Sequence, residues 1–248
     1  MTHHMLESTS TSPRYRNILF DLDGTLLDFS LSEQDALHSA LRKHNLACTD
    51  EIRRRYSAIN NAMWKQLEKG EITRKQLLVA RFESLLEQIG AQGDPAQINQ
   101  DYLTALSQTA YLLPHALEVC RILAQHCRLA IITNGNACTQ HGRFEKCGLA
   151  PYFSGLFISE EVGAQKPASV FFDTVLAKME PIQKSETLIV GDSPSSDITG
   201  GNLSKIDTCW YNPKHTESTV PSTYEIDDLR QLLPLILGNK GKDLLEKA

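Results

Sequence analysis

Three aspartates and one lysine stand at points in this chain where their side chains could do chemistry together. Asp21 and Asp23 follow one short apolar run, and Asp192 follows another. Lys166 lies in a polar loop between the two runs. Carboxylates at close range repel one another, so a cluster of aspartates implies a bound cation. Hard oxygen ligands favour Mg²⁺, which keeps waters and phosphate oxygens in its coordination shell. The residue types therefore indicate a magnesium site that handles phosphate.

The spacing of the first two aspartates gives them different roles. Residues i and i+2 of a strand point the same way, so Asp21 and Asp23 would both reach the site. Gly24 and Thr25 form a turn signal directly after them, which would displace Asp23 from the strand direction. Asp21 could then attack phosphorus in line and form an aspartyl-phosphate. Asp23 could protonate the leaving oxygen and later deprotonate the water that cleaves the intermediate.

Groups suited to binding phosphate follow other apolar runs. Thr133 offers a hydroxyl donor, and the backbone amides around Asn134 offer more. Lys166 supplies positive charge for a transferring phosphoryl group. Ser193 belongs to a Gly-Asp-Ser-Pro loop ahead of a predicted helix. Each short motif is also common in ordinary turns, helix caps and solvated surfaces. Only their conjunction, in order and at predicted element ends, favours a catalytic site.

The elements that would position these residues alternate along most of the chain. Apolar runs predict β-strands at 17–20, 128–133, 156–158, 187–190 and 208–211. Helical patterns occupy 114–125, 136–147, 168–179, 198–203 and 226–237. Strands that alternate with helices indicate an α/β fold with a mostly parallel sheet covered on both faces. In such sheets ligands bind beyond the carboxyl ends of the strands, which is where the polar residues stand.

One long segment departs from this alternation. Between 30 and 110 apolar residues recur at helical spacing and strand-like runs are absent, which predicts a compact unit of about four helices. We therefore expect a core formed by 17–29 and 111–248, with a helical cap domain inserted at 30–110. Residues 1–16 are polar and rich in Ser and Thr, and we expect a flexible N-terminal tail there.

Composition limits the compartment and the partners. The 248 residues carry a formal net charge of -5, which argues against a nucleic-acid polymer as partner. No apolar run reaches the roughly 20 residues that span a bilayer, and the N-terminus lacks the apolar stretch of a secretory signal. The six cysteines form no Cys-x-x-Cys pair, so we expect reduced thiols rather than a zinc site or disulfides. We expect a cytoplasmic monomer or weak dimer, with no membrane partner, that acts on a small phosphorylated metabolite.

The motifs together resemble those of the haloacid dehalogenase-like hydrolase superfamily. The matching stretches are Phe-Asp-Leu-Asp-Gly-Thr-Leu from residue 20, Ile-Ile-Thr-Asn-Gly from residue 131, Lys166-Pro167, and Gly191-Asp192 with Asp197 further on. This resemblance implies a Rossmann-like three-layer core with a helical cap inserted after the first motif. It also implies that Asp21 is the nucleophile and Asp23 the acid and base.

The same resemblance implies a ligand set for the metal and for phosphate. Mg²⁺ would be held by Asp21, the Asp23 carbonyl and Asp192. Thr133 and Lys166 would bind phosphate, and Asp197 would support either Lys166 or the coordination shell of the metal.

A narrower resemblance indicates the pyrimidine 5'-nucleotidase branch of that superfamily. Similar stretches lie in the cap at 60–64, 70–73 and 81–83 and in the core at 158–163 and 208–210. Residues 136–138 and 202–204 depart from the usual pattern of the branch. Trp64, Arg81 and Phe82 are candidates for substrate contact, although aromatic residues at helical spacing usually pack a helical core.

The narrower resemblance implies pyrimidine nucleoside monophosphates as substrates, while sugar phosphates, flavin mononucleotide and phosphoglycolate stay open. A sugar phosphomutase would resemble this architecture and also use two aspartates. A 2-haloacid dehalogenase needs no acid for its leaving group, so Asp23 argues against that activity. A non-catalytic binding module is disfavoured because every motif residue is present.

Overall fold

A six-stranded parallel sheet forms the core, which confirms the predicted α/β fold. The computed structural model describes residues 13–245. The strands lie in the order β3-β2-β1-β4-β5-β6, and all neighbouring pairs run parallel. They are β1 (Asn17–Phe20), β2 (Arg128–Thr133), β3 (Leu156–Ile158), β4 (Thr187–Gly191), β5 (Asp207–Tyr211) and β6 (Tyr224–Ile226). Because β2, β1 and β4 are neighbours, the residues that follow them meet at one edge of the sheet.

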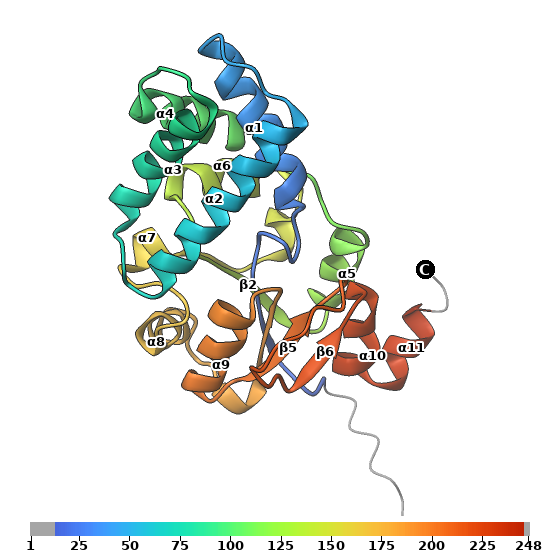
Figure 1. Ribbon diagram of the computed structural model, residues 1–248. Coiled ribbons are helices and arrows are strands. Elements are labelled where there is room, and N and C mark those ends of the chain that lie inside the picture. Colours follow the sequence, from blue (N-terminus) through green and yellow to red (C-terminus); the bar gives the residue numbers. More distant parts are fainter. Residues whose placement is uncertain (1–12, 246–248) are drawn as a thin grey trace, which may run out of the picture.

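Helices cover both faces of this sheet, which gives the predicted three layers (Figure 1). Ile18 and Phe20 of β1 are buried in one apolar cluster with α5 (Ala116–Leu123) and α10 (Leu232–Leu237). Leu19, between them, is buried in a second cluster with α8 (Ser169–Lys178) on the opposite face. Alternate strand residues thus fill two separate cores. The core helices are α5 (Ala116–Leu123), α6 (Ala137–Lys146), α7 (Ser159–Val162), α8 (Ser169–Lys178), α9 (Thr199–Ser204), α10 (Leu232–Leu237) and α11 (Asn239–Leu245).

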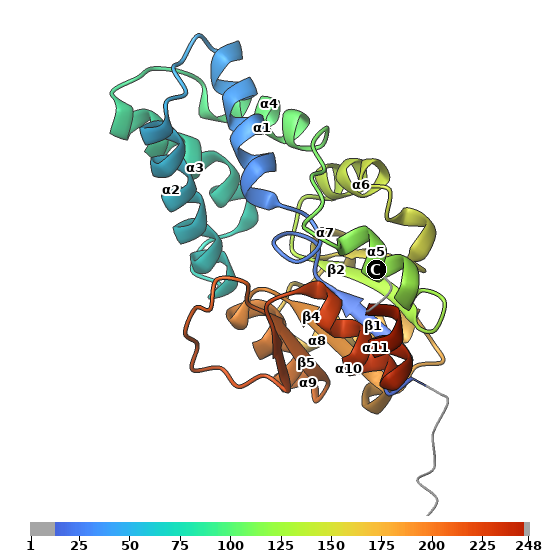
Figure 2. The ribbon, with the colours of Figure 1, turned by 90° about the vertical axis from the view of Figure 1, so that its right-hand side faces the viewer.

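The inserted segment forms a helical unit above the carboxyl edge of the sheet (Figure 2). It contains α1 (Phe29–Lys43), α2 (Asp50–Glu68), α3 (Arg74–Ile89) and α4 (Pro95–Leu106). These helices share an apolar cluster of their own, centred on the packed rings of Tyr56, Phe82 and Tyr102. An Asp or Thr side chain caps the N-terminus of each of the four, which ends the chain's extended path and starts the helix. The unit therefore carries its own packing core.

Two short segments that lie side by side connect the cap to the core. The backbone N–H of Asp28 donates to the Tyr111 carbonyl at 2.7 Å. The backbone N–H of Leu113 donates to the Leu26 carbonyl at 2.9 Å. The chain thus leaves and re-enters the core through one paired crossing, directly after Asp23. Both covalent connections between cap and core therefore lie at this crossing.

Two sequence predictions are wrong at their boundaries. The predicted tail ended at residue 16, but Tyr15 is 1% exposed, and the backbone N–H of Arg16 donates to the Glu186 carbonyl. Residues 1–12 of that predicted tail lie outside the described residues. The predicted helix at 226–237 begins only at Leu232, because Ile226 instead pairs with Tyr211 as the last residue of the edge strand β6.

Two further observations concern the surroundings of the protein. None of the helices in the described part of the chain combines the length and apolar character needed to cross a membrane. All six cysteines are free thiols, and four of them are buried.

Candidate active site

Asp21 and Asp192 leave adjacent strands at the carboxyl edge of the sheet. Asp21 follows β1, and its backbone N–H donates to the Val190 carbonyl of β4 at 2.8 Å. Gly24 turns the chain there with a φ of +85°, a conformation that favours glycine. A Cβ atom on Gly24 would lie 2.4 Å from Asp192 Oδ2. The first motif therefore needs a glycine at this position for the two aspartates to come together.

Lys166 is the buried cation of the site. Its Nζ donates to Asp21 Oδ1 at 2.6 Å and to Asp197 Oδ1 at 2.6 Å. It also donates to the Ile132 carbonyl of β2 at 3.0 Å. Burial lowers the pKa of Lys166, but the carboxylates of Asp197 and Asp21 outweigh burial and hold this pKa above its usual range. Lys166 therefore stays charged at neutral pH and fixes both carboxylates.

A carboxylate cluster beside Lys166 could hold a metal ion. Asp21, Asp192 and Asp197 each offer an oxygen, and these oxygens lie within 4.8 Å of one another. Burial raises the pKa of Asp21; Lys166 opposes this effect, and Asp197 and Asp192 add to it. Burial and the Asp197 carboxylate raise the pKa of Asp192 to about 7. Three carboxylates face one lysine, so a divalent cation would neutralise the excess charge, and hard oxygen donors fit Mg²⁺.

Both carboxylate oxygens of Asp197 accept hydrogen bonds within the protein. Oδ1 accepts from Lys166, and Oδ2 accepts from the backbone N–H of Ser193 at 3.2 Å. The Ser193 side chain in turn caps the π-helical turn Pro194–Ile198 by accepting from the Ser196 N–H at 3.3 Å. Asp197 is fully buried. These contacts suit the supporting role predicted for Asp197 and Ser193.

The remaining predicted residues near the ends of β1 and β2 lie close to Asp21 and Lys166. Thr25 Oγ1 lies 3.4 Å from Asp21 Oδ2 and donates to it. Thr133 and Asn134 line the space that holds Asp21 and Lys166. The Asn134 side chain makes two bonds to the Lys166 backbone, accepting from its N–H at 2.9 Å and donating to its carbonyl at 2.8 Å. Its side-chain amide therefore anchors the lysine loop, which leaves the Thr133 hydroxyl and the backbone amides nearby for phosphate.

Two side chains that the sequence did not reveal hold Asp23. Gln140 Nε2 donates to Asp23 Oδ2 at 2.8 Å and to Thr133 Oγ1 at 2.7 Å. Arg143 Nη1 forms an ion pair with Asp23 Oδ1. Both residues lie on α6, three positions apart and hence on one helical face. The only sequence signal for them is a pair of polar residues at that spacing. Nothing in the sequence pattern indicates that this face of α6 points toward Asp23 and not toward solvent.

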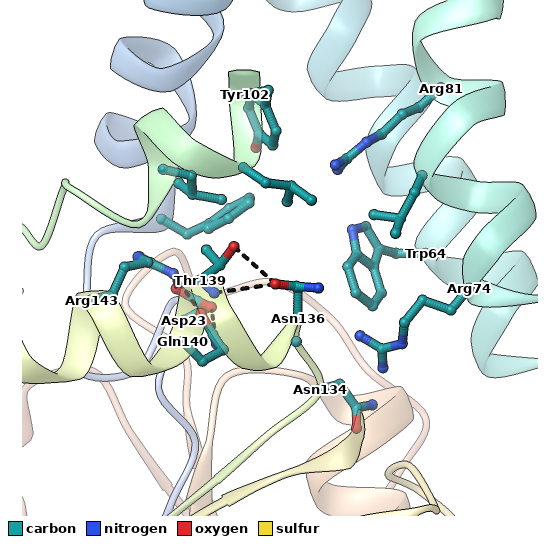
Figure 3. A pocket seen from close by; sticks show the side chains of 15 residues that line it. Asp23, Trp64, Arg74, Arg81, Tyr102, Asn134, Asn136, Thr139, Gln140 and Arg143 are labelled. Atoms are coloured by element: carbon teal, nitrogen blue, oxygen red, sulfur yellow. Dashed lines mark hydrogen bonds and ion pairs between the residues drawn. The ribbon is translucent and has the colours of Figure 1, made fainter. Parts of the chain in front are cut away.

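A pocket between cap and core opens beside Asp23 (Figure 3). Trp64 of α2 and Arg74 of α3 form its cap side, and the Arg74 guanidinium lies 5.7 Å from the centre of the Trp64 ring. Asn134 and Asn136 approach from the core below. Apolar side chains of the cap line it as well: Phe29, Leu78, Leu103 and Leu106. The pocket thus joins the acid candidate to an aromatic wall of the cap.

The cap also reaches the carboxylate cluster directly. Glu68, at the end of α2, lines the space around Asp21 and Asp192 and accepts a hydrogen bond from Ser195 Oγ at 2.8 Å. Burial raises the pKa of Glu68. Arg74 Nη2 donates to Ser159 Oγ of the core at 2.7 Å. These contacts hold the end of the cap against the core, and sequence analysis did not single out Glu68.

The candidates for substrate contact in the cap have different surroundings. Phe82 is fully buried in the cap cluster, as the packing interpretation predicts. Arg81 is 2% exposed, and its guanidinium donates to Asn60 Oδ1 at 3.0 Å and Asn99 Oδ1 at 2.7 Å. It forms part of the far wall of the pocket. Of the three, Trp64 has the best access to a bound molecule, and its contact with substrate stays a prediction.

Comparisons with known proteins agree with this geometry. The family model for haloacid dehalogenase-like hydrolases matches residues 15–204. The chain is 36% identical to the pyrimidine 5'-nucleotidase PynA of Streptococcus pneumoniae, over 94% of this chain and 98% of PynA. It is 34% identical to the pyrimidine 5'-nucleotidase YjjG of Escherichia coli, over 88% of this chain and 96% of YjjG. A solved structure of YfnB from Bacillus subtilis bound to magnesium superposes with a TM-score of 0.87 at 36% identity, covering 91% of this chain and 99% of YfnB.

Proposed function

The chain belongs to the haloacid dehalogenase-like hydrolase family, and on that premise we propose that it is a magnesium-dependent phosphomonoester hydrolase acting on nucleoside monophosphates. The observation that carries this proposal is the meeting of Asp21, Lys166 and Asp192 at one sheet edge, directly beside the pocket that contains Asp23 and Trp64. The first three residues suit phosphoryl transfer, and the pocket suits a leaving group that carries a flat ring.

In the first step an Asp21 oxygen attacks phosphorus in line. The bond between phosphorus and the ester oxygen breaks, and Asp23 gives its proton to that oxygen. The products are an alcohol and an aspartyl-phosphate on Asp21. Lys166 keeps the Asp21 carboxylate oriented and stabilises negative charge on the transferring group.

In the second step water cleaves the intermediate. The Asp23 carboxylate takes a proton from water, and the water oxygen attacks phosphorus. The bond between phosphorus and the Asp21 oxygen breaks, which returns Asp21 as a carboxylate and releases inorganic phosphate. Asp23 ends the cycle protonated, ready to act as the acid again. The cap contacts of Glu68 and Arg74 would keep other water away during the first step.

Mg²⁺ is the proposed cofactor. Asp21 and Asp192 would hold it through their side chains and Asp23 through its backbone carbonyl, with Asp197 close enough to complete the carboxylate cluster. The ion, when bound, supplies charge neutralisation for the phosphoryl group. The YfnB structure was solved with magnesium bound, which supports this choice.

Pyrimidine nucleoside monophosphates are the proposed substrates. Two relatives at 34–36% identity carry the name pyrimidine 5'-nucleotidase. The Trp64 ring gives the pocket an aromatic surface on which a nucleobase could stack. Arg74 and Asn136 add polar groups that could bind a base or ribose edge. The residues of the pocket therefore fit the class of substrate that the relatives' names suggest.

The proposed setting is the cytoplasm, with the protein as a monomer or weak dimer. Six free thiols, four of them buried, suit a reducing compartment. Size-exclusion chromatography with light scattering would give the mass in solution. A stable assembly larger than a dimer would contradict this proposal.

The proposed function is tested by phosphate release from a panel of phosphomonoesters, with Mg²⁺ and then with a chelator. The panel should hold pyrimidine and purine nucleoside monophosphates, sugar phosphates, flavin mononucleotide and phosphoglycolate. We expect release that depends on Mg²⁺ and favours the pyrimidine nucleotides. Metal-dependent release with another preference would reject the nucleotidase assignment. No release by folded protein, or isomerised sugar phosphate in its place, would reject the hydrolase.

A further inference from the structure

Arg143 is a buried charged side chain that the mechanism above does not use. None of its side-chain surface is exposed. Besides the ion pair with Asp23, its Nε donates to the Thr109 carbonyl at 3.3 Å, and its Nη2 lies 3.5 Å from Ser32 Oγ. The guanidinium also lies 5.7 Å from the centre of the Phe29 ring. A guanidinium is a rigid planar fork, so one orientation of Arg143 satisfies all of these contacts together.

The partners of Arg143 belong to both segments that join cap and core. Phe29 and Ser32 stand at the start of α1, where the chain enters the cap. Thr109 stands just after α4, where the chain leaves it. Arg143 itself belongs to the core helix α6. One core side chain thus contacts both segments that connect the cap to the core, and it also contacts the Asp23 carboxylate.

Gln140 completes the enclosure of Asp23. Its amide donates to Asp23 Oδ2 and Thr133 Oγ1, while its own Oε1 accepts from Arg143 Nη1 at 3.3 Å. The bond with Arg143 fixes which end of the amide faces Asp23, because an amide turned around would set two donors against each other. Each Asp23 oxygen therefore meets one N–H donor whose direction is set by Arg143.

We propose that Arg143 is a positioning residue that orients the Asp23 carboxyl toward the leaving oxygen. It also couples this orientation to the position of the segments that connect the cap to the core. This assignment rests on the proposed function. Without Arg143, the Asp23 carboxyl loses its fixed direction, and misplacing a reacting group by about 1 Å can cost roughly 100-fold in rate. The loss should be confined to the steps that Asp23 serves.

Leaving groups of different basicity isolate those steps. A nucleoside 5'-monophosphate releases an alkoxide-like oxygen that needs a proton from Asp23, whereas p-nitrophenyl phosphate releases a stable phenolate that does not. Attack by Asp21 on the aryl ester should thus survive in Arg143→Met, and hydrolysis of the aspartyl-phosphate should be slow. The expected signature is a burst of p-nitrophenolate close to one per enzyme, followed by slow turnover.

The experiment measures burst and steady-state kinetics on uridine 5'-monophosphate and p-nitrophenyl phosphate for wild type, Arg143→Met and Arg143→Lys. The loss in kcat on the nucleotide should exceed the loss in the aryl burst rate by at least about tenfold. Arg143→Lys keeps a buried positive charge, and hence the fold, but loses the fork, so it should show the same split. Lys146→Met is the matched control, because Lys146 is exposed on the same helix.

An aryl burst rate that falls by as much as kcat on the nucleotide, in protein shown by circular dichroism to be folded, would overturn the positioning role. A nucleotide loss no larger than that of Lys146→Met would also overturn it. If the wild-type protein itself released no phosphate from either ester, both the proposed function and the positioning role would be wrong. If the wild type is active and only the predicted split in Arg143→Met is missing, the positioning role alone is wrong.

Discussion

Replacing Lys166 by methionine removes the one ammonium group that Asp21 and Asp197 share. The side chain keeps nearly its length and volume, so the change is mainly electrostatic. Lys166 is 1% exposed, and both of its carboxylate partners lie 2.6 Å from Nζ. The two aspartates are themselves buried, so solvent cannot take over the role of the lysine.

The magnitude follows from leaving buried charge without a partner. Breaking a buried ion pair by removing one member typically costs about 3–5 kcal/mol. The whole stability of a protein is about 5–15 kcal/mol, so Lys166→Met should lose a large fraction of it. Buried carboxylates without a partner take up protons instead of staying charged. The loss should therefore be largest at pH 8 and smaller at pH 5, and added Mg²⁺ should recover part of it at pH 8.

The assay is urea unfolding followed by tryptophan fluorescence. The chain has two tryptophans, Trp64 in the cap and Trp210 in β5, so a Trp64→Phe background makes the signal report the core alone. Lys178→Met is the control, since Lys178 is an exposed lysine on α8. If the free energies of unfolding of Lys166→Met and Lys178→Met differed by less than about 0.5 kcal/mol at pH 8, the buried ion-pair network would be refuted, because such a small cost is typical of a surface substitution.

Two further predictions concern the metal cluster. With a chelator present, stability should fall as pH rises from 5 to 8, because the raised pKa of Asp192, about 7, means that the folded state holds a proton which the unfolded state has already lost. The proposed Mg²⁺ would bind the ionised form of Asp192, so added Mg²⁺ should weaken or reverse this fall. Thermal melts of wild type and Asp192→Asn, with and without Mg²⁺, check both points. An unchanged slope of stability against pH in Asp192→Asn would contradict the assignment. Gly24→Ala should weaken Mg²⁺ binding by at least about tenfold, because its Cβ would meet Asp192 Oδ2 at 2.4 Å. Gly70→Ala, with a φ of +74° and no atom within 4 Å of its Cβ, separates this clash from backbone strain, and equal Mg²⁺ affinity of the two variants by calorimetry would refute it.

The sheet could be predicted because its strands are covered on both faces. In β1, β2 and β4 nearly every residue is buried, which gives the continuous apolar runs seen in the sequence. The edge strand β6 has no such run: Tyr224 is partly buried, Glu225 is exposed, and only Ile226 enters the core. Three residues of that kind carry no strand signal, so the sequence pattern places Ile226 in the following helix.

The site could be predicted only where residue type and strand end coincide. Asp21 and Lys166 stand in short motifs whose order along the chain is informative, and the structure brings them together. Arg143 and Gln140 lie in the middle of a polar helix, where an inward and an outward position look the same in sequence. Their importance arises from where α6 packs relative to Asp23, which depends on contacts between distant segments.

The central claim is that Asp21 becomes phosphorylated during turnover. The direct measurement is mass spectrometry of acid-quenched Asp23→Asn protein mixed with p-nitrophenyl phosphate and Mg²⁺, because this variant should form the intermediate and fail to hydrolyse it. We predict one phosphoryl group on the peptide that contains residue 21, and none when Asp21→Asn is added to the variant. A phosphoryl group on any other residue, or phosphate release from Asp21→Asn at the wild-type rate, would contradict the account.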